Sequence, residues 1–422
     1  MSNLSQRDSK YIWHPYTQMQ TAGLPIGIVK GEGSYLFDEN GKRYIDAVSS
    51  WWVNIHGHAH PHIANAIAVQ AKELEQVIFA GFTHEPAIKF AEKFMPLLPR
   101  NQQKLFLSDN GSTAVEAAIK MALQFFFNHQ KPRTKIIAFR DAYHGDTFGS
   151  MSVSARGIFT QPFNQLLFDV LFIDTPTATN HSTVVTQFQQ HITEHENEIA
   201  AFIFEPLILG SAGMLMYDAV VLNQLMTVAK DHNIFCIADE VMTGFGRTGK
   251  MFACEYLSVS PDIMCFSKGI TGGFMALGAT TCTNQIYEAF LSNEKAKMFF
   301  HGHSYTGNPL ACAAAYASLE VWEQENTLQK VKEISKLNLE FAVRLQGKNN
   351  IENVRALGTI IALDVITSEQ KGYTNSIRDK LYSYFIEKGI LLRPLGNTLY
   401  VLPPYCISEA DLNFVFDEIE TL

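Results

Sequence analysis

The chain has few of the features that mark secreted, zinc-binding or nucleic-acid-binding proteins. Only six of its 422 residues are cysteine, and no two of them form a C-x-x-C pair. Scattered cysteines within apolar runs are typical of buried, reduced thiols, so they predict neither a disulfide framework nor a zinc site. The net charge of −9, without a long basic block, argues against nucleic acid as a partner.

Membrane and export signals are also missing from the sequence. Residues 1–8 contain no apolar segment, so there is no visible secretory signal and we expect a cytoplasmic protein. The stretch 298–319 lacks Lys, Arg, Asp and Glu, but it contains His, Gly, Pro and Asn. That composition does not suit a membrane span and is more typical of a segment that lines a site.

The pattern of apolar runs predicts an α/β fold. From about residue 104, runs of strand length alternate with segments of helical spacing. Runs that are apolar on both faces are typical of a largely parallel sheet covered by helices on both sides. We expect strands at 104–107, 136–139, 170–173, 201–204 and 277–282, and in the runs that end at Asp239 and Ser267.

The length of the chain favours one large and one smaller domain. Residues 34–46 predict a β-hairpin that turns at Asn40–Gly41. The C-terminal part mixes polar helical segments with short strands, which predicts a smaller α+β unit. We therefore predict an N-terminal segment at 1–50 that contributes to the small domain, a large domain at 51–319 and the small domain at 320–422.

Two polar residues that follow apolar runs indicate the chemistry. Lys268 stands between an apolar run and a turn of small residues, and Asp239 ends a second run upstream. Functional groups in open α/β sheets gather beyond the carboxyl ends of the strands. Pyridoxal phosphate chemistry needs a lysine that forms a Schiff base and a carboxylate that keeps the pyridine nitrogen protonated. The pair therefore predicts an enzyme that uses pyridoxal 5'-phosphate.

The segment 108–113 is a candidate phosphate site between a strand and a helix. Gly111 lets the backbone approach an anion, Ser112 offers a hydroxyl, and the first amides of the helix donate to phosphate. Taken alone, the segment is more typical of an ordinary Ser/Thr helix cap with Glu116 in the first turn. In combination with Lys268 and Asp239, the phosphate interpretation is favoured.

Three further features keep two interpretations at this stage. Tyr143 follows a strand and suits either a lid over a cofactor ring or rim packing. Arg247 lies in a glycine-rich loop and suits either a substrate contact or an internal pair. The histidines at 56, 58, 60 and 62 would share one face of a strand, but Gly and Pro interrupt the segment and no carboxylate or cysteine accompanies it. Loop packing is therefore favoured there, and we predict no metal site.

Three motifs, at 109–118, 239–250 and 267–269, together resemble those of the class-III pyridoxal-phosphate aminotransferases. The resemblance spans nearly the whole chain and implies a fold-type-I transferase with a mainly parallel seven-stranded sheet. Four further stretches are most similar to the branch of the family that transfers an amino group from S-adenosylmethionine to 8-amino-7-oxononanoate in biotin biosynthesis. They are 13–17, 49–57, 143–149 and 392–394.

The resemblance implies a role for each matching residue. Lys268 would be the Schiff-base lysine, Asp239 the partner of the pyridinium nitrogen and Tyr143 a neighbour of the ring. Gly111 and Ser112 would hold the phosphate.

The same resemblance implies a substrate site. Tyr16, Trp51 and Gly302 would shape it together with Tyr143 and Lys268, and Tyr16 would lie near the adenine of the donor. Arg393 would take the substrate carboxylate, which suits the planar fork of a guanidinium.

The segment 301–304 matches one that reaches the phosphate of the neighbouring subunit in the family, which implies a homodimer with shared sites. Here the chain has His303–Ser304 where the family pattern has Pro-Thr. Ser304 keeps a hydroxyl for phosphate, and His303 is a second candidate cofactor contact.

Rival functions remain open from the sequence. The segment 210–213 lacks the glutamate that ornithine- and GABA-type relatives carry, which disfavours those two activities. An enzyme with lysine as the amino donor, an ω-amino acid:pyruvate transaminase and a non-catalytic binding relative are the alternatives.

Overall fold

A seven-stranded sheet forms the centre of the larger part of the molecule. The computed structural model describes residues 3–422, so residues 1–2 of the predicted N-terminal segment lie outside the described residues. The strand order is β4-β12-β11-β10-β7-β5-β6, and only β12 runs antiparallel to its neighbours. The strands are β4 (Gln102–Ser108), β5 (Lys135–Phe139), β6 (Leu171–Ile173), β7 (Ile199–Phe204), β10 (Phe235–Asp239), β11 (Ile263–Phe266) and β12 (Gly278–Thr283). All seven predicted runs form strands, and the predicted α/β fold is confirmed.

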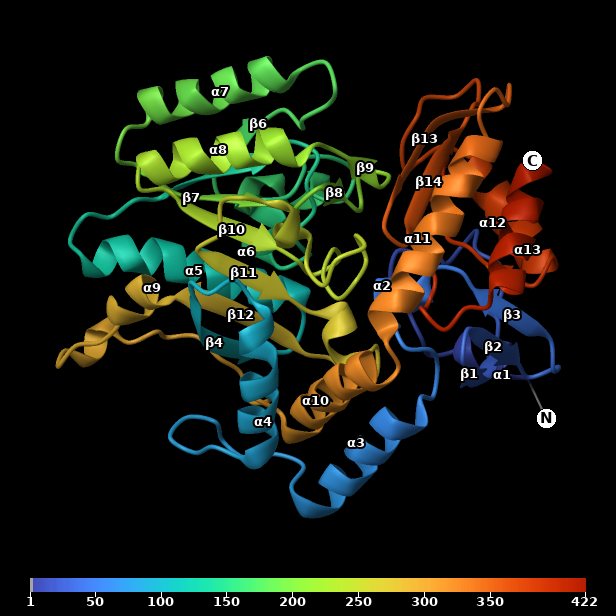
Figure 1. Cartoon of the computed structure of the whole chain (residues 1–422), viewed down its shortest axis with the longest axis horizontal. Helices are drawn as coiled ribbons and strands as arrows, with labels where there is room; N and C mark the ends of the chain where they lie inside the picture. Colours follow the sequence, from blue (N-terminus) through green and yellow to red (C-terminus); the bar gives the residue numbers. More distant parts are fainter. Residues whose placement is uncertain (1–2) are drawn as a thin grey trace.

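Helices cover both faces of this sheet (Figure 1). In β7 every residue is buried, and successive side chains enter different cores: Phe202 and Phe204 join one hydrophobic cluster, and Ala201 and Ile203 join another. This alternation follows from the two-residue period of a strand. The covering helices are α4 (Glu85–Phe94), α5 (Gly111–Asn128), α7 (His181–Glu194), α8 (Ala219–Asp231) and α10 (Pro309–Gln324), and α3 (Pro61–Glu73) packs against α10.

The N-terminal and C-terminal segments of the chain lie side by side (Figure 1). The predicted hairpin forms between β2 (Tyr35–Asp38) and β3 (Arg43–Asp46), with Gly41 at φ 83°. β3 also pairs in parallel with β15 (Ile390–Leu391). The other elements here are α1 (Leu4–Asp8), β1 (Ile28–Glu32), α11 (Thr327–Arg344), β13 (Ile351–Leu357), β14 (Ile360–Val365), α12 (Ile377–Glu387), β16 (Thr398–Val401) and α13 (Glu409–Glu420).

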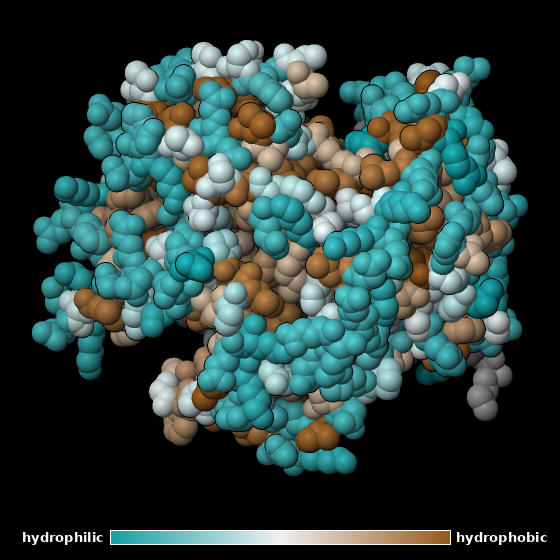
Figure 2. Space-filling model, in the orientation of Figure 1, coloured by the Kyte–Doolittle hydropathy of each residue, from teal (hydrophilic) through white to brown (hydrophobic). Residues whose placement is uncertain are grey.

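The remaining short elements lie near the centre and at the edge of the large sheet. They are α2 (Ser49–Trp52), α6 (Phe148–Ser152), β8 (Ile208–Leu209), β9 (Leu215–Met216) and α9 (Asn284–Glu288). In the face shown in Figure 2, the outer surface of α11 is hydrophilic, and hydrophobic residues gather between the central sheet and the C-terminal part. Across residues 3–422, no helix has both the length and the apolar composition that a membrane crossing requires.

Candidate active site

A cavity of about 600 Å³ opens at the carboxyl ends of the parallel strands. Its wall combines the ends of β10 and β11 with residues from the N-terminal and C-terminal segments. Eight of the predicted site residues line it: Tyr16, Trp51, Gly111, Ser112, Tyr143, Asp239, Lys268 and Arg393. Gly302, His303 and Ser304 are not among its lining residues.

Lys268 lies at the floor of the cavity, two residues after the end of β11. Its backbone has φ 49°, a left-handed conformation that is uncommon outside glycine and that occurs at functional sites. The Nζ atom lies 4.8 Å from the centre of the Trp52 ring. Burial lowers the pKa of Lys268 to about 8, although the carboxylates of Asp239 and Glu205 oppose this shift. A lysine with a lowered pKa is a better general base near neutral pH than an ordinary one.

Asp239 lies on the neighbouring strand and is held by His144. In the sheet Asp239 is paired with Cys265, three residues before Lys268. Its Oδ2 atom lies 2.7 Å from His144 Nδ1, and its Oδ1 atom accepts from the Val241 amide at 3.1 Å. Both side chains are almost completely buried, so this contact keeps a buried carboxylate satisfied. The sequence pattern gave no role to His144, because a contact between distant segments leaves no local signal.

Glu205 is a second buried carboxyl group, and it lines the cavity. It follows β7 and accepts hydrogen bonds from the amides of Tyr143 and Gly210, each at 3.0 Å. Burial raises the pKa of Glu205 to about 7. Because it holds the backbone of Tyr143, Glu205 fixes the position of this tyrosine in the cavity wall.

The predicted phosphate turn leaves two helix amides free. The N-cap of α5 is Asn110, whose Oδ1 accepts from the Thr113 amide at 2.9 Å. The helix therefore has an ordinary cap, with Asn110 rather than a Ser or Thr as the cap residue and Thr113 completing the capping box. The first amides of a helix have no partner within the helix, so those of Gly111 and Ser112 can donate to an anion.

The side chains around this turn agree with a phosphate site. A Cβ atom on Gly111 would come within 2.7 Å of Val241 Cγ1, so only glycine allows this close packing. Glu116, the expected capping partner, instead accepts from the Gly149 amide at 2.7 Å. The free amides, Lys268 and the buried Asp239 together fit pyridoxal phosphate.

Aromatic residues form the rim of the cavity. The ring centre of Tyr16 lies 5.5 Å from Trp51 and 5.8 Å from Phe159, and Phe159 lies 4.8 Å from Tyr373. The Tyr16 hydroxyl donates to Asp146; burial and this contact raise its pKa to about 12.

Arg393 brings a positive charge to the rim. Its guanidinium lies 4.6 Å from the centre of the Trp51 ring. The rim therefore offers flat aromatic surfaces beside a cation, which suits a ligand with an aromatic ring or a carboxylate.

A left-handed turn places Trp51 in this rim. Four successive residues, Ser49 to Trp52, have φ between 44° and 74°, and none of them is glycine. Such backbone is strained and persists only where its surroundings hold it. The buried carboxylate of Asp46 accepts from the Ser50 amide at 3.0 Å and from the Ser50 hydroxyl at 2.8 Å, and it lies 2.9 Å from His58 Nε2.

Arg247 makes internal contacts, which resolves the two interpretations left open by the sequence. Its guanidinium is buried and donates to the carbonyls of Pro403, Trp52 and Asn54 at 3.0 to 3.2 Å. It therefore supports the left-handed turn from below. The four neighbouring histidines also have separate partners: His56 contacts Ser318, His58 contacts Asp46, His60 contacts Glu325 and His62 contacts Glu320.

The segment expected to reach a neighbouring subunit lies beside the phosphate turn of its own chain. His303 Nε2 is 3.8 Å from Asp109 Oδ1. The carbonyl of Ser304 accepts from Gln76 Nε2 at 2.7 Å, so the segment packs on the loop that contains Gln76.

Comparison with known proteins identifies the family. The model of the class-III aminotransferases matches residues 16–422. The chain is 45% identical over 98% of both chains to the adenosylmethionine-8-amino-7-oxononanoate aminotransferase of Synechococcus elongatus. Among solved structures it is similar to the enzyme of that name from Methanocaldococcus jannaschii, with a TM-score of 0.94, 36% identity and coverage of 99% of this chain and 97% of that one.

A second solved structure indicates the cofactor. The chain is similar to the omega transaminase of Pseudomonas jessenii in complex with PMP, with a TM-score of 0.93, 26% identity and coverage of 99% and 97% of the two chains. The predicted cofactor, pyridoxal 5'-phosphate, is the one that this family uses. The chain belongs to the class-III aminotransferases, and the predicted resemblance is confirmed.

Proposed function

We propose that the chain transfers an amino group from S-adenosylmethionine to 8-amino-7-oxononanoate and forms 7,8-diaminononanoate, a step of biotin biosynthesis. The observation that carries the proposal is one cavity with Lys268 and Asp239 at its floor and Trp51 and Arg393 at its rim. Relatives that share 45% and 39% of their residues with this chain over nearly its whole length bear the name of this activity.

The floor residues would perform the chemical steps. When bound, pyridoxal phosphate supplies a ring that withdraws electrons from the amino carbon of the substrate. Asp239, held by His144, would stabilise the proton on the ring nitrogen. Lys268 would take the proton from the donor's α-carbon, because its lowered pKa favours the neutral amine. The amides of Gly111 and Ser112 would hold the phosphate, and Tyr143 would pack beside the ring.

The rim residues would select the substrates. Tyr16 and Trp51 offer faces on which an adenine can stack, and Tyr16 is fixed by its hydrogen bond to Asp146. Arg393 would pair with a substrate carboxylate. Both substrates would use the same rim in turn, so the donor product must leave before the ketone binds. This order is a ping-pong mechanism.

We also propose a cytoplasmic homodimer with shared active sites. The loop around Gln76 and the segment 298–306 lie together and expose large apolar side chains, which favours burial against a second copy. They are Ile78, Phe82, Met298, Phe300 and Tyr305. The partner copy would bring Gly302, His303 and Ser304 to the phosphate and the substrate, and light scattering tests the dimer.

The division of the chain into 1–50, 51–319 and 320–422 is part of the same proposal, and the pairing of β3 with β15 supports it. We propose neither nucleic acid nor a membrane as a partner.

Formation of the diamine tests the function. The cofactor-loaded enzyme receives 8-amino-7-oxononanoate with S-adenosylmethionine or with lysine, and mass spectrometry measures the product. A parallel reaction contains an ω-amino acid and pyruvate. It tests the second candidate activity, that of an ω-amino acid:pyruvate transaminase, which the similarity to an omega transaminase supports. We expect diamine formation with S-adenosylmethionine and at least tenfold less with lysine. Product from lysine alone, or transfer only to pyruvate, would refute the proposed donor.

A further inference from the structure

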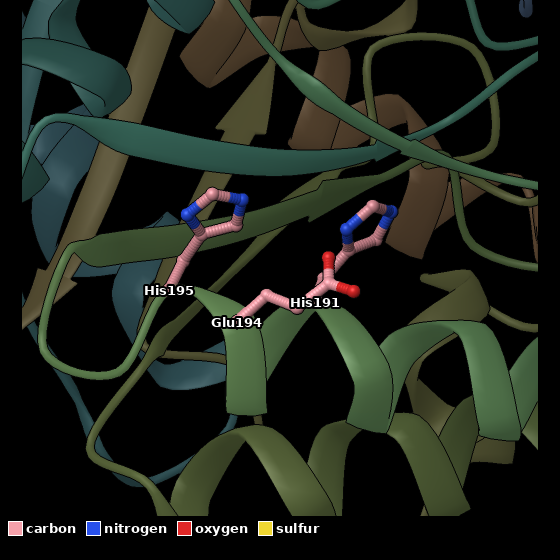
Figure 3. Close-up of side chains that lie close together, drawn as sticks. All are labelled: His191, Glu194 and His195. Atoms are coloured by element: carbon pink, nitrogen blue, oxygen red, sulfur yellow. The ribbon is translucent and has the colours of Figure 1, made fainter.

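A cluster of metal-ligating side chains lies at the C-terminal end of α7, outside the cavity. His191, Glu194 and His195 each offer one ligand atom, and these atoms all lie within 4.8 Å of one another. Figure 3 shows the two imidazoles and the carboxylate extending from the last turn of the helix. The two histidines are four residues apart, a spacing that places side chains on one face of a helix.

The protonation of His191 leaves a free lone pair inside the cluster. Its Nε2 atom lies 3.2 Å from the carbonyl oxygen of Phe172 in β6 and must donate to it. In the neutral imidazole this leaves Nδ1 with a lone pair, and Nδ1 is buried without a hydrogen-bond partner. A ligating histidine commonly donates its other N–H to a backbone carbonyl, which fixes the ring for metal binding.

Glu194 and His195 also have neighbouring polar side chains that orient them or add negative charge. Gln190 Nε2 donates to Glu194 Oε1 at 2.7 Å, so one carboxylate oxygen is oriented and the other remains available. The carboxylate of Glu198 lies 3.7 Å from His195 Nδ1 and adds negative charge. The C-terminal end of the 14-residue helix itself favours a cation through its dipole.

We propose that His191, Glu194 and His195 bind a divalent transition-metal ion of the zinc type, with solvent as the fourth ligand. Two imidazoles and a carboxylate form a donor set that suits Zn²⁺. In a tetrahedral zinc site ligand atoms lie about 3.3 Å apart, so the exposed Glu194 side chain and His195 would rotate to bring the ligand atoms from within 4.8 Å to that separation.

The site would fasten α7 to the edge of the sheet. His191 already contacts β6, which is the outermost strand. The cluster is remote from the reaction, because β7 begins at Ile199, just after His195, and the cavity lies beyond its other end at Glu205. Six residues of strand span about 20 Å. Metal binding should therefore raise stability and leave transamination unchanged.

Zinc titration of the cofactor-loaded protein tests the site. A chromophoric chelator competes for Zn²⁺ with the wild type and with the variants His195→Ala, Glu194→Gln and His181→Ala. His181 lies at the opposite end of α7 and is the matched control. The cofactor phosphate and the partly exposed Cys406 also have affinity for zinc, so the readout is the difference between variants.

We expect one zinc ion per chain in the wild type and in His181→Ala. Its affinity should fall about tenfold or more in His195→Ala and Glu194→Gln. Zinc should raise the unfolding temperature of the wild type but not of His195→Ala, and both proteins should keep full transaminase activity. Equal zinc affinity in the wild type and His195→Ala would overturn the proposed site. Equal zinc affinity in the wild type and Glu194→Gln would show that Glu194 is not a ligand and would contradict the three-ligand set.

Discussion

The floor and the rim of the cavity are built in different ways. Floor residues such as Asp239 and Lys268 lie at the ends of neighbouring strands of one sheet, and the backbone hydrogen bonds between β10 and β11 set their separation. Rim residues such as Tyr16 and Arg393 come from opposite ends of the chain, and Tyr16 and Trp51 remain more than a third exposed.

This difference separates chemistry from substrate choice. The floor is buried and carries ionisable side chains, which favours shifted pKa values. The rim is half-exposed and aromatic, which favours recognition of large flat or charged groups. Changes at the floor should therefore affect every substrate, and changes at the rim should affect substrates unequally.

Loss of the floor lysine should have the largest effect. Lys268→Ala removes both the attachment point of the cofactor and the general base, so turnover should fall about 10³-fold or more with any amino donor. Steady-state assays with two donors measure this loss. Lys336→Ala, on an exposed helix surface, is the control and should be fully active. Equal activity of Lys268→Ala and the wild type would remove this lysine from the mechanism.

Loss of Asp46 should disrupt the support of the rim. Asp46→Ala leaves several buried donors of the left-handed turn unsatisfied, so the free energy of unfolding should fall by about 2–4 kcal/mol. Ser50→Ala removes a single hydroxyl contact and should cost about 1 kcal/mol. Urea denaturation compares the two variants. Equal stability of Asp46→Ala and Ser50→Ala would show that this carboxylate does not hold the turn.

The buried Glu205 should make stability depend on pH. Its pKa is raised from 4.5 to about 7, so the native state holds a proton that the unfolded state releases between these values. Its contribution to stability is therefore complete below about pH 4.5 and is lost as the pH rises through about 7. This loss is about 3 kcal/mol at most.

Glu205→Gln removes the titration, so the free energy of unfolding should fall less between about pH 5 and pH 7 than in the wild type. Denaturation at several pH values measures this slope, with the exposed Glu340→Gln as the control. Identical slopes in the wild type and Glu205→Gln would mean that this carboxyl group does not titrate there.

A substitution at the rim should have the smallest effect on activity, and that effect should differ most between amino donors. Trp51→Ala removes a stacking surface worth about 1–3 kcal/mol for a base, so kcat/KM for S-adenosylmethionine should fall roughly 5–150-fold. The value for a small aliphatic amine donor should change by less than about twofold. Steady-state kinetics with both donors check this prediction. An equal loss of kcat/KM for both donors would mean that Trp51 acts in the chemical steps, as the floor residues do, and not in the choice of donor.

The sequence predicted the floor better than the rim, for a physical reason. Buried strands leave continuous apolar runs, so the positions of Asp239 and Lys268 at strand ends could be inferred. The contact of His144 with Asp239 joins separate strands and has no local pattern. The left-handed turn at Trp51 contains no glycine, so nothing in its composition signals positive φ. Tyr16 and Arg393 were therefore assigned through family resemblance alone.

The donor half-reaction tests the separation of floor and rim most directly. The pyridoxal form of the wild type and of Trp51→Ala is mixed in a single turnover with S-adenosylmethionine or with lysine, and absorbance follows the conversion of the cofactor. We predict rapid conversion of the wild type by S-adenosylmethionine and a selective loss of that reaction in Trp51→Ala. A wild type that S-adenosylmethionine does not convert, or a variant equally impaired with both donors, would contradict the account.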